Sequence, residues 1–145
     1  MLNRRATGDA GSSLMLMPVA VLIVLLLGAI AVDLSVVRLA HRDLLDVAAS
    51  AANDAATDGL DPDHYRRTGT YEIDLARAYT ALDRTIEHRH LANPVTARLI
   101  TAGPGPDEIT VELESSVPAL FAKALPGAPH HTTIRAKATA AVQRR

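Results

Sequence analysis

The clearest hydrophobic pattern in the chain is a long apolar run near its N-terminus. Residues 14–32 read LMLMPVAVLIVLLLGAIAV, and no charged residue occurs from residue 10 to residue 32. A helix rises about 1.5 Å per residue, so about 20 apolar residues cross the roughly 30 Å hydrocarbon core of a bilayer. The rest of the chain is too polar to bury such a helix. We therefore expect a transmembrane helix over residues 14–32, marked by Leu14, Pro18, Leu25, Gly28 and Val32.

The charges that flank this run indicate its orientation. Arg4 and Arg5 precede it, and basic residues before an apolar segment favour a cytoplasmic N-terminus. Arg38 and Arg42 follow the other end and reduce that asymmetry. We expect a cytoplasmic tail over residues 1–13, a single span in the cell membrane, and an extracytoplasmic domain over residues 33–145.

The same N-terminal features also fit a secretory signal peptide. A basic start and an apolar stretch precede Ala29-Ile30-Ala31, which matches an A-x-A cleavage site. Cleavage after Ala31 would release a secreted soluble binding domain. The run is longer than the apolar region of most signal peptides, and the helical pattern continues past Ala31, so a retained span is the favoured interpretation.

From residue 33 to residue 58 the pattern becomes amphipathic with helical spacing. Polar residues recur every three or four positions on one face, namely Arg38, Arg42, Asp46, Ser50, Asn53 and Thr57. The other face is expected to pack on a partner and carries Leu34, Val37, Leu45, Ala48, Ala52 and Ala55, with His41 on the same side. Gly59 and the Asp61-Pro62 pair are typical helix stops. The pattern predicts one continuous helix from Ser13 to about Asp58, with residues 33–58 as an amphipathic stem.

The remainder of the chain predicts a small mixed domain. A polar connection over residues 61–71 leads to a helix over residues 74–90, capped by Asp74. Its apolar stripe is Leu75, Ala78, Tyr79, Leu82 and Ile86.

The spacing then changes to the alternation of strands, expected at about 95–101, 108–115 and 131–142. The inward positions are Val95, Ala97 and Leu99, then Ile109, Val111 and Leu113, then Ile134, Ala136, Ala138, Ala140 and Val142. We predict an α+β fold in which a three-stranded antiparallel sheet and the second helix pack on the stem. Residues 117–125 form a short apolar stretch, expected as a satellite of this core, with a membrane or partner contact as the alternative.

Composition narrows the function classes. Aromatic residues are 3% of the chain, so the core must consist mainly of Ala, Val, Leu and Ile. The net charge of −1 argues against a nucleic-acid partner held by bulk electrostatics. Cysteine is absent, which excludes disulfides, thiolate zinc sites and thiol catalysis.

Few residues suggest chemistry. His88-x-His90 and His130-His131 could bind a metal, but neither has helical i,i+4 spacing or an evident carboxylate partner. Glu112 and Glu114 share one strand face, which is the solvent side of an alternating strand. Asp33 is expected to sit at the membrane interface, or to pair with a neighbouring subunit. No phosphate-binding loop, nucleophile elbow or H-E-x-x-H motif occurs. We expect no enzyme activity, metal or cofactor.

Several stretches together resemble a known family. They are Leu16-Met17-Pro18, Ala31-Val32-Asp33-Leu34, residues 38–52 (RLAHRDLLDVAASAA), Phe121 with Leu125-Pro126-Gly127, and residues 134–140 (IRAKATA). With the pilin-like layout of a membrane helix, stem and α+β head, these stretches resemble the TadE/TadG-like proteins of the bacterial tight-adherence (Flp) pilus assembly system.

That resemblance implies a membrane-anchored accessory subunit of a pilus or related secretion apparatus. Pilins cut by a prepilin peptidase carry a Gly at the cut and a Glu five residues into the mature chain. The fifth residue after Gly11 is Leu16, and the fifth after Gly8 is Ser13. An unprocessed TadG-like subunit therefore fits better than a fibre subunit. The implied partners are other pilus-assembly membrane subunits or pilin-like proteins, in a homo- or hetero-oligomer formed through the helix.

Overall fold

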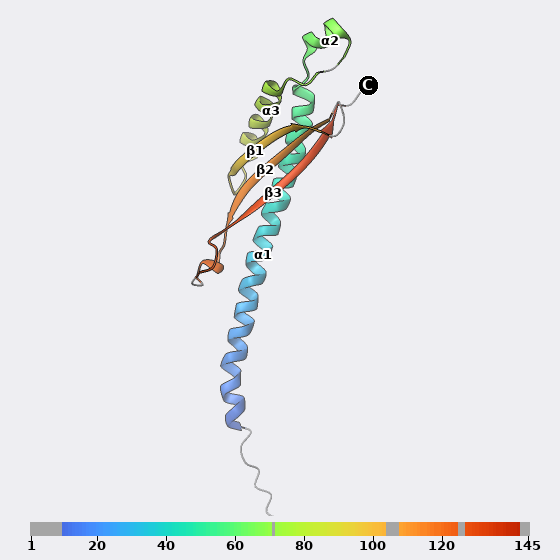
Figure 1. The fold of residues 1–145 in the computed structure, drawn as a ribbon. Coiled ribbons are helices and arrows are strands. Elements are labelled where there is room, and N and C mark those ends of the chain that lie inside the picture. Colours follow the sequence, from blue (N-terminus) through green and yellow to red (C-terminus); the bar gives the residue numbers. More distant parts are fainter. Residues whose placement is uncertain (1–9, 71, 104–107, 125–126, 143–145) are drawn as a thin grey trace, which may run out of the picture.

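The fold is a long helix with a small α+β head packed around its second half (Figure 1). The computed structural model describes residues 10–70, 72–103, 108–124 and 127–142, without the side chains of residues 10–15 and 124. The helical elements are α1 (Ala10–Asp58), α2 (Pro62–Thr68), α3 (Leu75–His88) and the 3-10 turn η1 (Ala122–Ala124); the strands are β1 (Val95–Ala102), β2 (Glu108–Pro118) and β3 (His131–Ala141). The predicted α+β layout of a long apolar helix, further helices and a three-stranded antiparallel sheet is confirmed.

The helix α1 is uninterrupted over 49 residues, with Pro18 inside it. At about 1.5 Å per residue it is about 74 Å long. It ends at Asp58: the N–H of Gly59 still donates to the Ala55 carbonyl at 3.0 Å, and the chain then turns away. A side chain at position 59 would collide with that carbonyl and with Ala78 of α3, so glycine permits the close approach of α1 and α3.

The polar connection predicted over residues 61–71 contains a short helix, α2 (Pro62–Thr68), which the sequence pattern did not predict. The Asp61 side chain accepts hydrogen bonds from the N–H groups of Asp63 and His64 at 2.9 and 3.1 Å, and Pro62 occupies the first helical position. The Asp61-Pro62 pair that ends one helix therefore also begins the next. The segment that contains α2 is closed at its base by two backbone hydrogen bonds. The Asp61 N–H donates to the Glu72 carbonyl, and the Asp74 N–H donates to the Gly59 carbonyl.

The helix α3 begins after the predicted cap, Asp74, whose carboxylate accepts hydrogen bonds from the N–H groups of Ala76 and Arg77. Its buried residues are Ala78, Ala81, Leu82 and Thr85. Leu75 is 52% exposed and does not belong to the packed face, because it lies in the first turn. The buried Thr85 hydroxyl donates to Asp54 of α1 at 2.6 Å, which ties the two helices together.

The sheet has the order β1-β2-β3, with both pairs antiparallel. The register of β1 shifts near its start: Val95 lies opposite Ser115 and Ala97 opposite Glu114, so two steps along β1 match one step along β2. Such a bulge turns all following side chains to the opposite face. The predicted inward positions Ala97 and Leu99 are therefore exposed, and Ile100 is buried in their place. The inward positions predicted for β2 and β3 are buried or half-buried, as expected.

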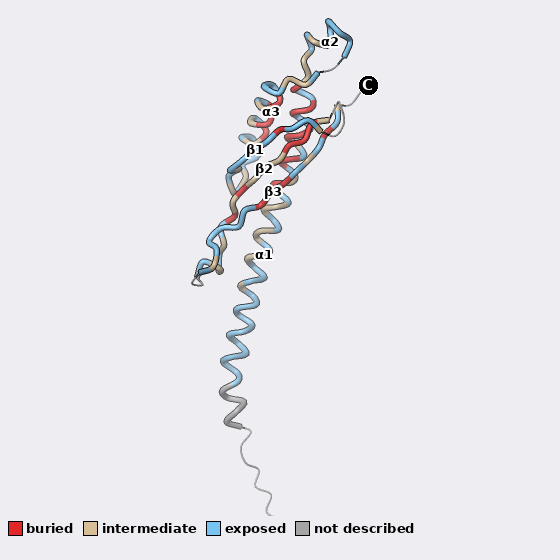
Figure 2. Tube along the Cα trace, viewed as in Figure 1, coloured by how far each residue is buried: buried red, intermediate tan, exposed pale blue. Residues whose placement is uncertain are grey.

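The core lies between one face of the sheet and the second half of α1, with α3 beside it (Figure 2). The fully buried larger side chains include Leu44, Leu82, Ile109, Val111, Leu113 and Val117. Alanine supplies most of the contact surface of α1, through Ala48, Ala51, Ala52, Ala55 and Ala56. Small side chains bring the sheet and α3 close to the α1 backbone, and the buried cluster consists of Ala, Val, Leu and Ile, as the low aromatic content predicted.

Candidate functional site

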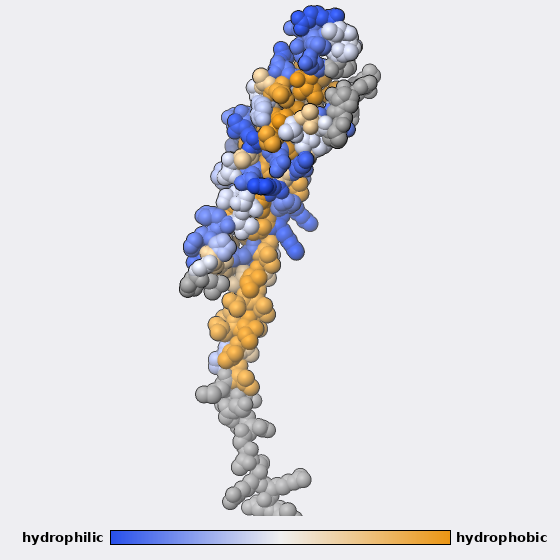
Figure 3. All heavy atoms as spheres, in the orientation of Figure 1, coloured by the Kyte–Doolittle hydropathy of each residue, from blue (hydrophilic) through white to orange (hydrophobic). Residues whose placement is uncertain are grey.

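The first half of α1 is an exposed apolar rod (Figure 3). Every residue from 16 to 32 is exposed except Ala29, which is half-buried. The predicted span residues Pro18, Leu25, Gly28 and Val32 all lie on this rod; Leu14 lies in α1, but its side chain is outside the described residues. A Cβ at Gly28 would meet no atom within 4 Å. By length and composition the chain has one helix able to cross a membrane among the described residues.

The second half of α1 carries the predicted stem residues, and most of them pack on the head. Ala48, Ala52 and Ala55 are fully buried, while Val37 and Leu45 are partly buried against the core. Leu34 is 55% exposed and is not among the residues packed against the core, although its neighbour Asp33 contacts the head. Pattern reasoning missed Leu44, Val47, Ala51 and Ala56, which are also buried. They widen the buried arc because α1 is covered from two sides.

The boundary between the two halves of α1 is occupied by Asp33. Its carboxylate accepts hydrogen bonds from the backbone N–H groups of Leu120 (2.9 Å), Phe121 (3.1 and 3.2 Å) and Ala122 (2.9 Å). The side chain thus caps the start of η1 from a different element, an arrangement we call the Asp33 clamp. Partial desolvation raises the pKa of Asp33, but the three N–H donors and the Lys123 charge outweigh it and hold that pKa below its ordinary 3.8.

The loop held by this clamp contains exposed apolar side chains. Leu120 is 45% and Phe121 is 50% exposed, so the expectation that residues 117–125 form a satellite of the core is wrong for these two. Val117 is buried at the end of β2, and Leu125 lies outside the described residues. The reason is geometric. The Asp33 clamp holds the backbone of residues 120–122 against α1, beyond the buried faces of the sheet.

The outer face of the sheet is polar, and several of its polar side chains contact each other across the strands. Glu112 and Glu114 lie opposite Lys137 and Arg135, and the Arg135 guanidinium contacts Glu114 at 2.8 Å. The hydroxyls of Thr110 and Thr139 bond across the strands at 2.8 Å. The two glutamates therefore have cross-strand cationic neighbours instead of the shared proton site of a catalytic carboxylate pair. Leu99 of β1, which lies opposite Glu112, is a large apolar residue that is 50% exposed.

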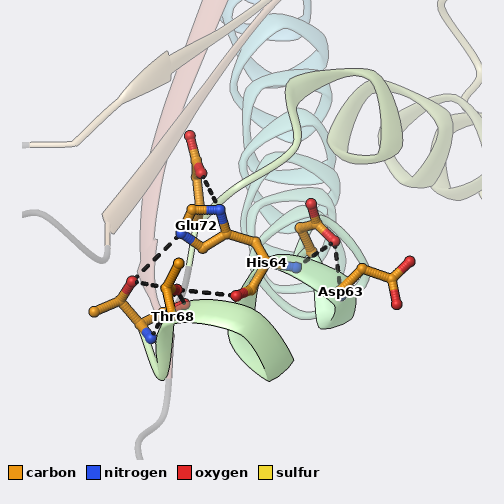
Figure 4. A network of polar contacts seen from close by, with 6 residues as sticks. Asp63, His64, Thr68 and Glu72 are labelled. Atoms are coloured by element: carbon orange, nitrogen blue, oxygen red, sulfur yellow. Dashed lines mark hydrogen bonds and ion pairs between the residues drawn. The ribbon is translucent and has the colours of Figure 1, made fainter.

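A second polar network lies at the far end of α1, in and around α2 (Figure 4). His64 Nδ1 lies 2.8 Å from the Glu72 carboxylate, and the Thr68 hydroxyl donates to the His64 carbonyl at 2.9 Å. The pKa of Asp61 is lowered because its carboxylate accepts from the His64 and Asp63 N–H groups, with smaller help from Arg77 and Arg67. These contacts shape the tip of the head and create no cluster suited to catalysis.

The histidines considered as possible metal ligands lie on the surface. His88, His90, His130 and His131 are all exposed, and the described residues contain no group of three or more His, Cys, Asp or Glu placed to hold a metal ion. A groove of about 510 Å³ runs beside the stem and is lined by Val37, Leu39, Ile134 and neighbouring residues. Its polar lining residues are Ser35, Arg38, His41 and Arg42, and His41 Nε2 lies 3.1 Å from the Arg135 carbonyl oxygen.

Comparisons with protein-family models, with curated proteins and with solved structures gave no match for this chain. The features of the molecule that bear on its function are the exposed rod of residues 16–32, the Ala-lined stem and the Asp33 clamp between them.

Proposed function

We propose that this protein is a single-pass membrane-anchored accessory subunit in the assembly of a Tad/Flp-type pilus or a related secretion apparatus. In this proposal residues 14–32 cross the cell membrane from a cytoplasmic tail, and the α+β head is extracytoplasmic. The proposal for the pilus system rests on the TadE/TadG-like stretches of the sequence. The proposal for the membrane rests on the geometry of α1.

The observation that carries the membrane anchor is the contrast between rod and head. Leu22, Val24 and Leu25 are between 65% and 68% exposed. They belong to a continuous apolar surface that no described part of the head covers. Water would penalise that surface by about 25 cal/mol for each Å² of apolar area left exposed. Lipid removes the penalty, and a helix satisfies its own backbone hydrogen bonds there.

The proposed mechanism is lateral association. The rod inserts in the bilayer, and Gly28 with Ala29 and Ala31 allows a neighbouring helix to approach closely. The open space around Gly28 supports this, since no described residue would come within 4 Å of a Cβ at that position. The head, held rigidly on the stem, would then present the outer face of its sheet to a pilin-like partner.

One observation favours the second candidate, a secreted binding domain released after Ala31. The polar and core contacts between α1 and the head begin at Asp33, two residues beyond that cleavage site. Cleavage would therefore leave the head and its clamp complete. Both candidates predict the same head, and they differ in what happens to residues 1–31.

The deciding experiment is the intact mass of the protein from washed membranes and from the culture medium of the native host. Full-length protein in the membranes supports the anchored subunit. A species starting at Val32 in the medium overturns the anchor and supports the secreted domain. A species starting at Ser12 would indicate prepilin-type processing and a fibre subunit.

The assembly role needs a separate test, which uses a photo-crosslinking amino acid at position 28 in native membranes. Position 26 serves as the matched control, because two residues rotate a helix by about 200°. We expect protein crosslinks at position 28 to exceed those at position 26, and the products to include pilus-assembly membrane proteins. Equal yields at the two positions would contradict lateral packing through Gly28, and products unrelated to a pilus or secretion apparatus would contradict the pilus role.

A further inference from the structure

The turn between β2 and β3 is placed beside the exit of the apolar rod. The Asp33 clamp fixes the backbone of Leu120, Phe121 and Ala122 within 3.2 Å of a carboxylate on α1. Asp33 follows Val32, the last residue of the uncharged run. The turn therefore lies at the height along α1 where the hydrocarbon region would end, to one side of the helix (Figure 1).

The side chains of this turn have the composition of a membrane interface. Leu120 and Phe121 are adjacent, 45% and 50% exposed, and Phe121 is the single phenylalanine of the chain. Lys123 follows and is exposed, as are His130 and His131 at the start of β3, where His131 lies opposite Pro118. Apolar side chains flanked by basic groups are typical of segments that lie in the headgroup region of a bilayer.

The clamp explains how such a turn can be held outward. A free loop would fold its Leu and Phe back onto the protein, because burial of apolar area is favourable. Here three consecutive N–H groups are committed to one carboxylate, and they fix the backbone from which these two side chains project. The Ala119 N–H also donates to the His130 carbonyl at 2.9 Å, which closes the base of the turn.

We propose that this turn, through the exposed side chains of Leu120 and Phe121, is a second membrane contact that rests on the phospholipid surface beside α1. The inference rests on the proposed function, because it requires residues 14–32 to lie in the bilayer. One helix alone leaves the head free to tilt and rotate at the surface. A second contact, fixed to α1 by Asp33, sets which side of the head faces the bilayer and which faces outward to partners.

The absence of tryptophan from the chain makes this testable by fluorescence. The full-length variant Phe121→Trp is reconstituted in phosphatidylcholine–phosphatidylglycerol vesicles that contain lipids brominated near the carbonyl end of the acyl chain. The matched control is Leu99→Trp, since Leu99 is equally 50% exposed. Leu99 lies opposite Glu112, six residues along β2 from Pro118, which is about 20 Å further up the sheet. A third variant, Leu25→Trp, reports whether the rod is inserted.

We expect a blue-shifted and quenched emission for Phe121→Trp, an unquenched emission for Leu99→Trp, and quenching of Leu25→Trp by lipids brominated near the chain terminus. If Leu25→Trp is quenched while Phe121→Trp behaves like Leu99→Trp, the turn does not touch lipid and the inference fails, although the membrane span stands. Equal quenching of Phe121→Trp and Leu99→Trp would overturn it too, because the whole head would then lie on the bilayer. An unquenched Leu25→Trp would remove the membrane span and the turn contact together.

Discussion

The two halves of α1 form one continuous helix, but the apolar side chains of the first half are exposed while many of those in the second half are buried against the head. The first half carries large residues such as Leu22, Ile23 and Leu25, all of them more than half exposed. The second half buries alanines, and Ala48, Ala51 and Ala55 have no exposed surface at all. Large branched side chains suit a fluid medium that adapts to any shape. Small side chains suit a rigid protein partner, whose backbone can then approach closely.

This difference shows why the average apolar content of a helix does not reveal its partner. Both halves of α1 have apolar side chains, yet only the apolar face of the second half, rich in alanine, is covered by the sheet and by α3. The change from one half to the other falls at Asp33, where a charge first appears and where the head first binds. Changes on either side of that residue should therefore have different consequences.

The largest effect is expected from filling the alanine-lined half. The double substitution Ala48→Leu with Ala52→Leu adds bulk at two fully buried positions and should destabilise the head by about 2–6 kcal/mol, at about 1–3 kcal/mol for each overpacked site. Urea unfolding of the full-length protein in detergent, followed by circular dichroism, measures the loss.

Ala49→Leu is the control for that experiment, because Ala49 is exposed on the same helix and leucine is also a good helix former. Its unfolding should change by less than about 0.5 kcal/mol. If the double variant is as stable as Ala49→Leu, the close packing of stem and head is wrong.

A charge in the rod should separate membrane insertion from folding. Leu25→Arg places a cation near the centre of the span and should disfavour insertion by about 2.5–3.5 kcal/mol. The amount of protein that resists a carbonate wash of the membranes should fall, while the head keeps its resistance to protease. Leu25→Phe should behave as the unchanged protein does. Loss of the folded head in Leu25→Arg would mean that the rod packs on the head.

Sequence periodicity predicted the architecture because its signals are local. The alternation of Ile109, Val111 and Leu113 and the spacing of Ala48, Ala52 and Ala55 each report a face that is buried in the structure. The failures are of two kinds. Some signals have two meanings, as at Asp61-Pro62, which is a typical stop pattern after a helix and in the structure begins α2. Others depend on pairing with another strand, as at Thr96, where the bulge reverses the faces of β1.

The Asp33 clamp could not be predicted for a third reason. Its donors lie 87 to 89 residues further along the chain and are backbone N–H groups, which every residue except proline carries. The only signal was an isolated acidic residue directly after the apolar run. That signal favoured an interface position, and it contained nothing about the turn after β2.

Removing the clamp should have a local effect at the boundary of the two halves. In Asp33→Ala the N–H groups of Leu120, Phe121 and Ala122 lose their acceptor, so their hydrogen exchange should accelerate while the core of the sheet stays protected. Asp61→Ala is the matched control, because it removes a cap that serves only its own helix, at Asp63 and His64. If exchange in the turn is the same in both variants, Asp33 does not hold it.

Acid should weaken the same clamp by a smaller amount. The pKa of Asp33 lies below its ordinary 3.8 in the folded protein, because hydrogen bonds from Ala122, Phe121 and Leu120 outweigh desolvation and Lys123 adds to them. A depressed carboxyl pKa contributes stability that is fully present above the unfolded value and is lost as the pH falls through the folded value. Protection of these three amides, corrected for intrinsic exchange, should therefore be constant from neutral pH down to about pH 4 and decline below it. In Asp33→Asn, which cannot ionise, protection should be lower at neutral pH and should show no such decline. If the protection of these three amides declines equally below about pH 4 in Asp33→Asn and in the unchanged protein, the ionised Asp33 carboxylate does not hold the turn.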